Sequence, residues 1–296
     1  MKLSAWLWGF LWLGLAVMPA FIANRAAERA YAMVYRTAEQ RLADLALIRD
    51  VEGLSIRLEG ELQAWRGSGE VPSILAATIP PGVEEADAPD AWKRRFLATT
   101  APLILKVNAL ITADRARLER LATAMRQGRA PNRAQKAWLA RLWQAYGVDE
   151  GDFTTLLERL DVVPPSLALA QAAVESAWGR SRFAAQGNAL FGQWTWRGRG
   201  LVPTARAAGA RHRVRAFPDL LRSVYAYIHN LNTHAAYAAF RAERQRQRLA
   251  GAGWDSPALA DTLLNYSALG EAYPRKLRAV MRVNRLADFD SAALAD

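Results

Sequence analysis

One apolar stretch, PPSLALAQAAVESAWG, constrains this chain of 296 residues more than any other segment. Glu175 is the only charged residue between positions 162 and 179. A proline pair followed by Ser166 marks a stop and an N-cap, so the sequence predicts a helix that begins near Leu167. A helix this apolar should be buried, and its one carboxyl group then needs an explanation.

On a helical wheel, the neighbours of Glu175 have mostly small side chains. One broad apolar face is formed by Leu167, Ala170, Val174, Ala177 and Trp178 and is widened by Leu169 and Ala173. Glu175 falls beside Gln171, and its other flank holds only Ala168, Ala172 and Ser176. Such a carboxyl group opens onto a partner or a cavity. Burial should raise its pKa, as a general acid working near neutral pH requires. A structural ion pair with Arg180 or Arg182 is the alternative.

The residues that follow resemble a known family. The segment 170–194, AQAAVESAWGRSRFAAQGNALFGQW, is similar to the glucosaminidase family of peptidoglycan hydrolases, whose pattern is AQ…ES.WG.S, a short loop, then N.FG. The downstream segments HNLNTHAAYAAFR and NYSALGEAYPRKL resemble its Bax-type branch, and the whole resemblance covers roughly residues 157–286. It implies a mainly α, lysozyme-like domain with a small β-hairpin lobe, whose cleft cuts the bacterial cell-wall glycan.

Composition limits the other classes of function. The chain has no cysteine, and its three histidines show no helical metal-ligand spacing, so we expect no metal site and no cofactor. The net charge of +11 comes from scattered arginines without a dense basic block. Nucleic-acid binding would rest on that charge alone, so we expect none, whereas peptidoglycan carries carboxylates and suits a basic protein. The oligomeric state is not predicted.

The N-terminus predicts a membrane segment. Residues 3–23 are uncharged, mostly apolar and long enough to span a bilayer. The small-x-small pattern of a cleavage site is poor, so we interpret residues 1–24 as an uncleaved anchor, with a signal peptide as the alternative. The protein is then expected in the bacterial cell envelope, anchored in the inner membrane and facing the periplasm, or exported.

Hydrophobic spacing divides the rest of the chain. Residues 25–66 are predicted to form a helical stalk, 67–91 a linker, 92–149 a helical extension and 150–290 the glucosaminidase domain. Within that domain, residues 191–217 predict the β-hairpin lobe, and further helices are expected over 219–232, 235–249, 257–266 and 273–286.

The expected second carboxylate is missing from the β-lobe. Glycoside hydrolysis usually takes two carboxylates. Between Ser176 and Pro218, however, the chain has eight arginines and no Asp or Glu. The next candidates for this role are Asp219, Glu243, Asp261 and Glu271. Alternatively, the 2-acetamido group of N-acetylglucosamine takes the nucleophile's role and Glu175 suffices. The resemblance then assigns the orienting tyrosine to Tyr266, with Tyr273 second.

Other polar and aromatic residues are candidates for binding the sugar. They are Gln171, Asn188, Phe191, Trp194, Trp196, Tyr227, Tyr237 and Tyr273. Trp194 and Trp196 alternate on a predicted strand, so they should point the same way, into the cleft or into a local core. Asn188 has loop capping as its alternative role. His229 and His234 are expected to make structural hydrogen bonds.

The sequence therefore predicts an endo-β-N-acetylglucosaminidase that acts on the glycan strands of peptidoglycan, with Glu175 and Tyr266 as its catalytic residues. A lytic transglycosylase is the first alternative, although N.LFG replaces the GLMQ-type segment usual in those enzymes. A non-catalytic glycan-binding scaffold is the second.

Overall fold

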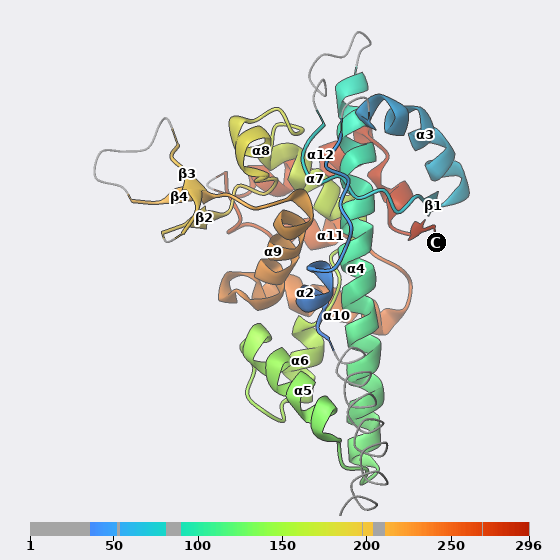
Figure 1. Cartoon of the computed structure of the whole chain (residues 1–296), viewed down its shortest axis with the longest axis vertical. Coiled ribbons are helices and arrows are strands. Elements are labelled where there is room, and N and C mark those ends of the chain that lie inside the picture. The colour runs from blue at the N-terminus through green and yellow to red at the C-terminus, as the bar shows by residue number, and fades with distance from the viewer. Residues whose placement is uncertain are drawn as a thin grey trace, which may run out of the picture.

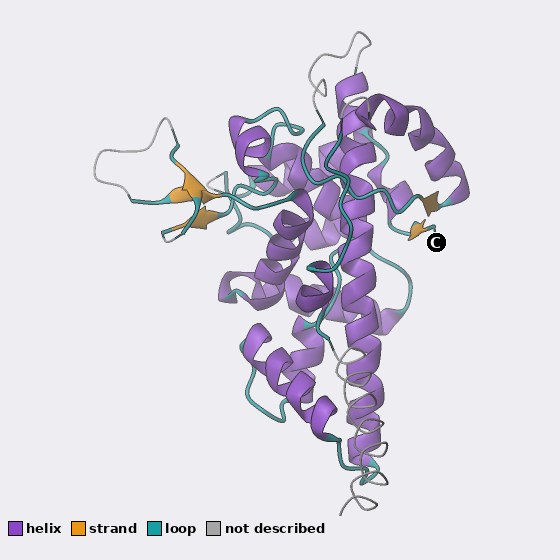
Figure 2. Cartoon of the chain, in the orientation of Figure 1, coloured by secondary structure: helices purple, strands orange, loops and turns teal. Residues whose placement is uncertain are grey.

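The computed structural model describes residues 36–51, 54–80, 90–196, 198–203, 211–267 and 269–295. Its helices are α2 (Ala38–Leu42), α3 (Leu54–Ser68), α4 (Ala91–Arg126), α5 (Arg133–Tyr146), α6 (Phe153–Arg159), α7 (Pro165–Glu175), α8 (Arg182–Gly187), α9 (Leu220–Thr233), α10 (Ala238–Ala250), α11 (Ser256–Asp261) and α12 (Ala272–Val283), with 3₁₀ helices η1 (Ala235–Tyr237) and η2 (Leu286–Phe289). The strands are β1 (Glu70–Val71), β2 (Trp194–Thr195), β3 (Gly200–Leu201), β4 (Arg213–Arg215) and β5 (Ala293–Leu294). The predicted mainly α class is confirmed (Figure 2).

Helix α4 is the central element. It is 36 residues long, runs along the long axis of the molecule and packs on α3, α7 and α9 (Figure 1). Among the described residues it alone is long and apolar enough to cross a membrane, and 72% of that apolar window is buried inside the protein. Its place in the core explains its composition. The predicted membrane segment, residues 3–23, lies outside the described residues and stays a prediction.

The region before α4 differs from the predicted stalk and linker. Helix α2 ends at Leu42, and Ile48 pairs in a parallel bridge with Ala76 instead of continuing a helix. The segment after α3 is also packed: β1 pairs in parallel with β5, and Leu75, Ala76 and Ala77 are buried. The Leu220 N–H donates to the Ala77 carbonyl, which ties this segment to α9.

Helix α7 begins and ends earlier than predicted. Pro164 is its N-cap residue and Pro165 its first residue, while Ser166 lies inside the helix and donates from its N–H and hydroxyl to Asp290, at 2.8 and 2.7 Å. The helix ends at Glu175, so the prediction that Ala177 and Trp178 continue its apolar face is wrong.

A tight turn replaces the last predicted helical turn. Ala177, Trp178 and Gly179 have φ values of 51°, 59° and 80°. A Cβ atom on Gly179 would lie 2.9 Å from the Phe96 ring, so glycine allows this close approach. Trp178 instead packs edge-on against Trp92 and Phe96, at centroid distances of 5.8 and 5.9 Å.

The small lobe is an antiparallel sheet of order β2-β4-β3, which projects to one side of the helices (Figure 2). Trp194 is opposite Val214, and Leu201 is opposite the same residue from the other side. The sheet forms within the predicted hairpin region. Of the later helices, α11 ends at Asp261 instead of continuing to residue 266, and Leu263 to Tyr266 form a turn.

A buried charge network joins this domain to α4. Asp161, just before α7, is 2% exposed and lies among Arg115 of α4 and Arg244 and Arg248 of α10. Arg244 is fully buried and donates to the carbonyls of residues 158, 161 and 162. Removal of Asp161 would leave buried positive charge without its counterion.

We therefore expect Asp161→Ala to lower the free energy of unfolding by about 3–5 kcal/mol, as loss of one partner of a buried pair does. Urea denaturation followed by circular dichroism measures this. The control is Glu119→Gln, which breaks a half-exposed pair with Arg115 and should cost less than about 1 kcal/mol. A loss below about 1 kcal/mol for Asp161→Ala would contradict the structural role of the network.

Candidate active site

Glu175 is the last residue of α7, at the point where the buried helix reaches a groove. Gly192, in the loop before β2, lies beside its carboxyl group: a Cβ atom on this glycine would lie 3.5 Å from Glu175 Oε2. Gly192 has φ +60°, which L side chains rarely adopt. The FG pair of the motif thus leaves room beside the carboxyl group.

A directed hydrogen-bond chain reaches Glu175 from the core. The Tyr227 hydroxyl donates to Gln171 Oε1 at 2.6 Å, and Gln171 Nε2 donates to the Tyr273 hydroxyl oxygen at 2.9 Å. The Tyr273 hydroxyl in turn hydrogen-bonds the Glu175 carboxyl group. Gln171, Tyr227 and Tyr273 are all fully buried, so the chain satisfies polar groups that water does not reach. It also fixes the position of the carboxyl group.

Burial raises the pKa of Glu175 above its ordinary value of 4.5, while the Tyr273 hydrogen bond and the positive charge of Lys276 partly oppose this rise. The predicted alternative partners are engaged elsewhere. Arg180 lies over the Trp92 ring at 4.0 Å, and Arg182 donates to the Val202 carbonyl. In the described part of the chain neither arginine forms an ion pair with Glu175, which removes the support for the structural ion pair.

The groove beside Glu175 has a volume of about 700 Å³. It is lined by Phe191, Gly192, Gln193, Trp194, Trp196, Asn230, His234, Tyr237, Leu264, Asn265, Tyr266 and Ser267. Trp194 and Trp196 are 59% and 70% exposed, with their rings edge to face at 6.4 Å. Both line the groove, and the Trp194 ring also stacks on His212 at a centroid distance of 4.4 Å. Tryptophan faces this exposed are suited to stacking on sugar rings.

Tyr266 connects the groove to the buried network. It is half-buried, lines the groove, and its hydroxyl donates to the Phe191 carbonyl at 3.3 Å. Its ring is parallel to that of Tyr273, at a centroid distance of 5.5 Å. Tyr237 packs against it at 5.8 Å. The structure thus brings Tyr266, Tyr273 and Glu175 together. Tyr266 lines the groove, whereas Tyr273 is buried behind it and Glu175 lies beside the groove residue Gly192.

Other predicted sugar-binding residues lie behind the groove. Asn188 is buried at the end of α8 with φ 51° and donates to the Phe217 carbonyl, so it caps a loop and does not line the groove. Tyr227 and Gln171 are buried in the network, and Phe191 stacks on Tyr227 at 3.8 Å. These residues support the wall, and Phe191 also reaches the groove.

The remaining acidic candidates have other partners. Asp219 caps α9 and pairs with Arg222. Glu243 pairs with Arg246, and Asp261 pairs with Arg278. Glu271 is exposed at the start of α12. Among the described residues no carboxylate contributes to the pKa shift of Glu175.

The histidines are structural, as expected, with one addition. His229 Nε2 donates to the Ala145 carbonyl at 2.9 Å, and His234 Nδ1 accepts from the Ala236 N–H. His234 also lines the groove, as does Asn230, which hydrogen-bonds Tyr237. Asn230 and Lys276 were not predicted from the sequence. The position of Lys276, three residues after Tyr273 in a helix, is the signal that would have placed it on the same face.

Comparison with known proteins shows the family to which this chain belongs. A sequence model of the glucosaminidase family, described as mannosyl-glycoprotein endo-beta-N-acetylglucosaminidase, matches residues 151–286. Protein bax of Escherichia coli (strain K12) is 36% identical over 200 residues, which are 65% of this chain and 70% of that protein. No solved structure gives a significant match. The chain belongs to the glucosaminidase family, in its Bax-like branch, and carries a glycoside hydrolase domain.

We expect ¹³C NMR of labelled glutamate to give Glu175 a pKa above 4.5. Tyr273→Phe and Lys276→Met should each raise it further, because each removes an interaction that favours the carboxylate. Tyr146→Phe, buried on another side of the domain, is the matched control and should leave it unchanged. A wild-type pKa at or below 4.5 would contradict the burial argument.

The same shift has a consequence for stability. Folded Glu175 binds its proton more tightly than unfolded Glu175, so its contribution to stability should fall as the pH rises through the folded-state pKa. In Glu175→Gln this part of the pH dependence should disappear.

Proposed function

We propose that the chain hydrolyses the β-1,4 glycosidic bond after N-acetylglucosamine in bacterial peptidoglycan, as an endo-β-N-acetylglucosaminidase. The observation that carries this proposal is the position of Glu175: a carboxyl group of raised pKa, hydrogen-bonded by Tyr273, beside Gly192 in the wall of an aromatic groove. The family membership supports the class of reaction.

Glu175 acts as the general acid. Its raised pKa favours the protonated form that a general acid needs, and the proton passes to the oxygen of the leaving sugar. Tyr273 and Lys276 limit the rise of the pKa and stabilise the carboxylate that proton transfer leaves behind. Trp194, Trp196 and Tyr237 bind the sugar rings along the groove.

The 2-acetamido group of the substrate acts as the nucleophile in this scheme. No carboxylate among the described residues interacts with Glu175. Of the four acidic candidates outside the β-lobe, Asp219 caps α9 and pairs with Arg222, Glu243 and Asp261 pair with other arginines, and Glu271 is exposed. Tyr266, on the groove side of Tyr273, orients the acetamido group. A lytic transglycosylase would also work with one Glu and differs in its product.

The cell envelope is the proposed location. Residues 3–23 would anchor the chain in the membrane, and the net charge of +11 favours an anionic polymer such as peptidoglycan.

Glu175→Gln should lower kcat on purified peptidoglycan by about 10²–10⁴-fold, because it removes the proton donor while keeping the side-chain shape. Release of soluble fragments measures the rate, and circular dichroism checks the fold. Glu271→Gln is the matched control and should keep near-wild-type activity. An active Glu175→Gln variant would refute the assignment, and an inactive Glu271→Gln variant would favour a second carboxylate.

Tyr266→Phe should lower kcat about tenfold or more with a smaller change in KM, because positioning of the acetamido group matters chiefly in the transition state. De-N-acetylated glycan should not be cleaved by the wild-type enzyme. Tyr146→Phe again serves as the control. Rapid cleavage of de-N-acetylated glycan would exclude substrate assistance.

A further inference from the structure

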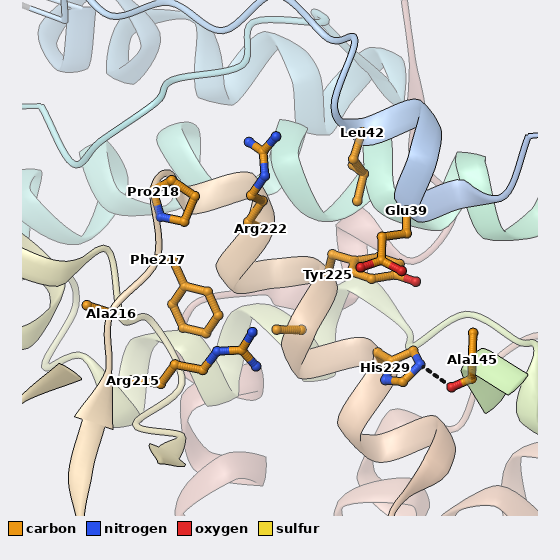
Figure 3. Close-up of a pocket in the computed structure, with 11 residues that line it drawn as sticks. Glu39, Leu42, Ala145, Arg215, Ala216, Phe217, Pro218, Arg222, Tyr225 and His229 are labelled. Atoms are coloured by element: carbon orange, nitrogen blue, oxygen red, sulfur yellow. Dashed lines mark hydrogen bonds between the residues drawn. The ribbon is translucent and has the colours of Figure 1, made fainter. Parts of the chain in front are cut away.

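A second pocket lies outside the proposed active site. It is about 340 Å³ in volume and is formed by α2, the end of α5, residues 215–218 and α9 (Figure 3). Its α2 wall, Glu39 and Leu42, lies before the region that matches the glucosaminidase family. The N-terminal part of this chain therefore completes a cavity on the catalytic domain.

Opposite charges occupy the two ends of this pocket. Arg215 and Arg222 lie beside Phe217 and Pro218, while Glu39 lies at the other end near Tyr225 and His229 (Figure 3). Arg215 is exposed over the Phe217 ring at 4.8 Å, and it has no ion pair among the described residues. Glu39 is exposed and likewise has no ion pair in the described part of the chain. Both charges are free to bind a ligand.

The floor between these charges offers neutral polar groups. His229 donates from Nε2 to the Ala145 carbonyl, and burial lowers its pKa, so the neutral ring keeps Nδ1 as an acceptor. Tyr225 is one turn before His229 on α9, and their rings are 5.8 Å apart. Such groups suit the amides of a short peptide.

The pocket adjoins the groove through one residue, Gln193, which lines the groove. Its carbonyl accepts from the Arg215 N–H at 2.7 Å, and its Nε2 donates to the Ala226 carbonyl at 3.2 Å; both partners line the second pocket. Gln193 Oε1 is buried without a donor in the described part of the protein. Gln193 therefore links the wall of the groove to the wall of the second pocket.

We propose that this pocket binds a short zwitterionic peptide attached to the glycan in the groove, with its carboxylate at Arg215 and its ammonium group at Glu39. The glycan attachment rests on the proposed function; recognition of the two charged groups does not. Arginine binds carboxylates through paired N–H donors, and Arg222 offers further donors at the same end.

The direct test is an NMR titration of the full chain with an N-acetylated tripeptide that has a lysine side chain and a free C-terminal carboxylate. Arg215→Gln and Glu39→Gln should each weaken binding about two- to fivefold, as ion pairs at an exposed rim do. Amidation of the peptide carboxylate should weaken binding to wild type but not to Arg215→Gln. Acetylation of the peptide lysine should weaken binding to wild type but not to Glu39→Gln. Arg129→Gln, on an exposed loop after α4, is the matched control.

Absence of saturable binding, or equal losses on amidation in wild type and Arg215→Gln, would overturn the proposal. This titration needs no catalysis, so it is readable even if the proposed hydrolysis fails. A kinetic comparison then tests the glycan-attached source: wild type should show a lower KM for intact peptidoglycan than for the same glycan stripped of peptides, and Arg215→Gln should lose that preference. If the wild-type KM is equal for intact and peptide-stripped glycan, the pocket does not bind a peptide attached to the glycan, and that part of the proposal is overturned.

Discussion

The burial of α7 is the constraint on which the rest of the site depends. Its small side chains let α4, α11, α12 and η2 pack around it. A helix enclosed in this way must have each polar group satisfied by protein atoms. Asp290 does this at the start of the helix, and Tyr227 and Tyr273 do it for Gln171 in the middle. The tyrosine hydrogen bonds thus follow from the burial of Gln171, and the same network positions the Glu175 carboxyl group.

The end of α7 gives Glu175 its chemistry. The C-terminal end of a helix carries partial negative charge, which disfavours a carboxylate and acts in the same direction as burial. The turn at residues 177–179 ends the helix there, and Gly192 leaves the carboxyl group uncovered on the groove side. A continuous helix would have carried the chain past the groove. The early end of α7 and the raised pKa of Glu175 are therefore linked.

The sequence predicted the parts of this arrangement that depend on local pattern. The isolation of Glu175 in an apolar helix marked it as a candidate, and the alternation of Trp194 and Trp196 left them open between the cleft and a local core; both tryptophans line the groove. The positive φ values of Ala177 and Trp178 have no such signal, because neither residue type favours the left-handed region. The irregular segment around Ile48 depends on pairing with Ala76, and the capping role of Asn188 depends on the Phe217 carbonyl. Patterns of neighbouring residues in the sequence do not predict such distant partners.

The central claim is that one carboxyl group, aided by the acetamido group of the substrate, hydrolyses the glycan after N-acetylglucosamine. Mass spectrometry of the products from whole peptidoglycan tests it most directly, because each rival reaction leaves a different sugar at the new chain end. The account predicts fragments with a new reducing-end N-acetylglucosamine. Fragments that end in 1,6-anhydromuramic acid would instead show a lytic transglycosylase and contradict the account.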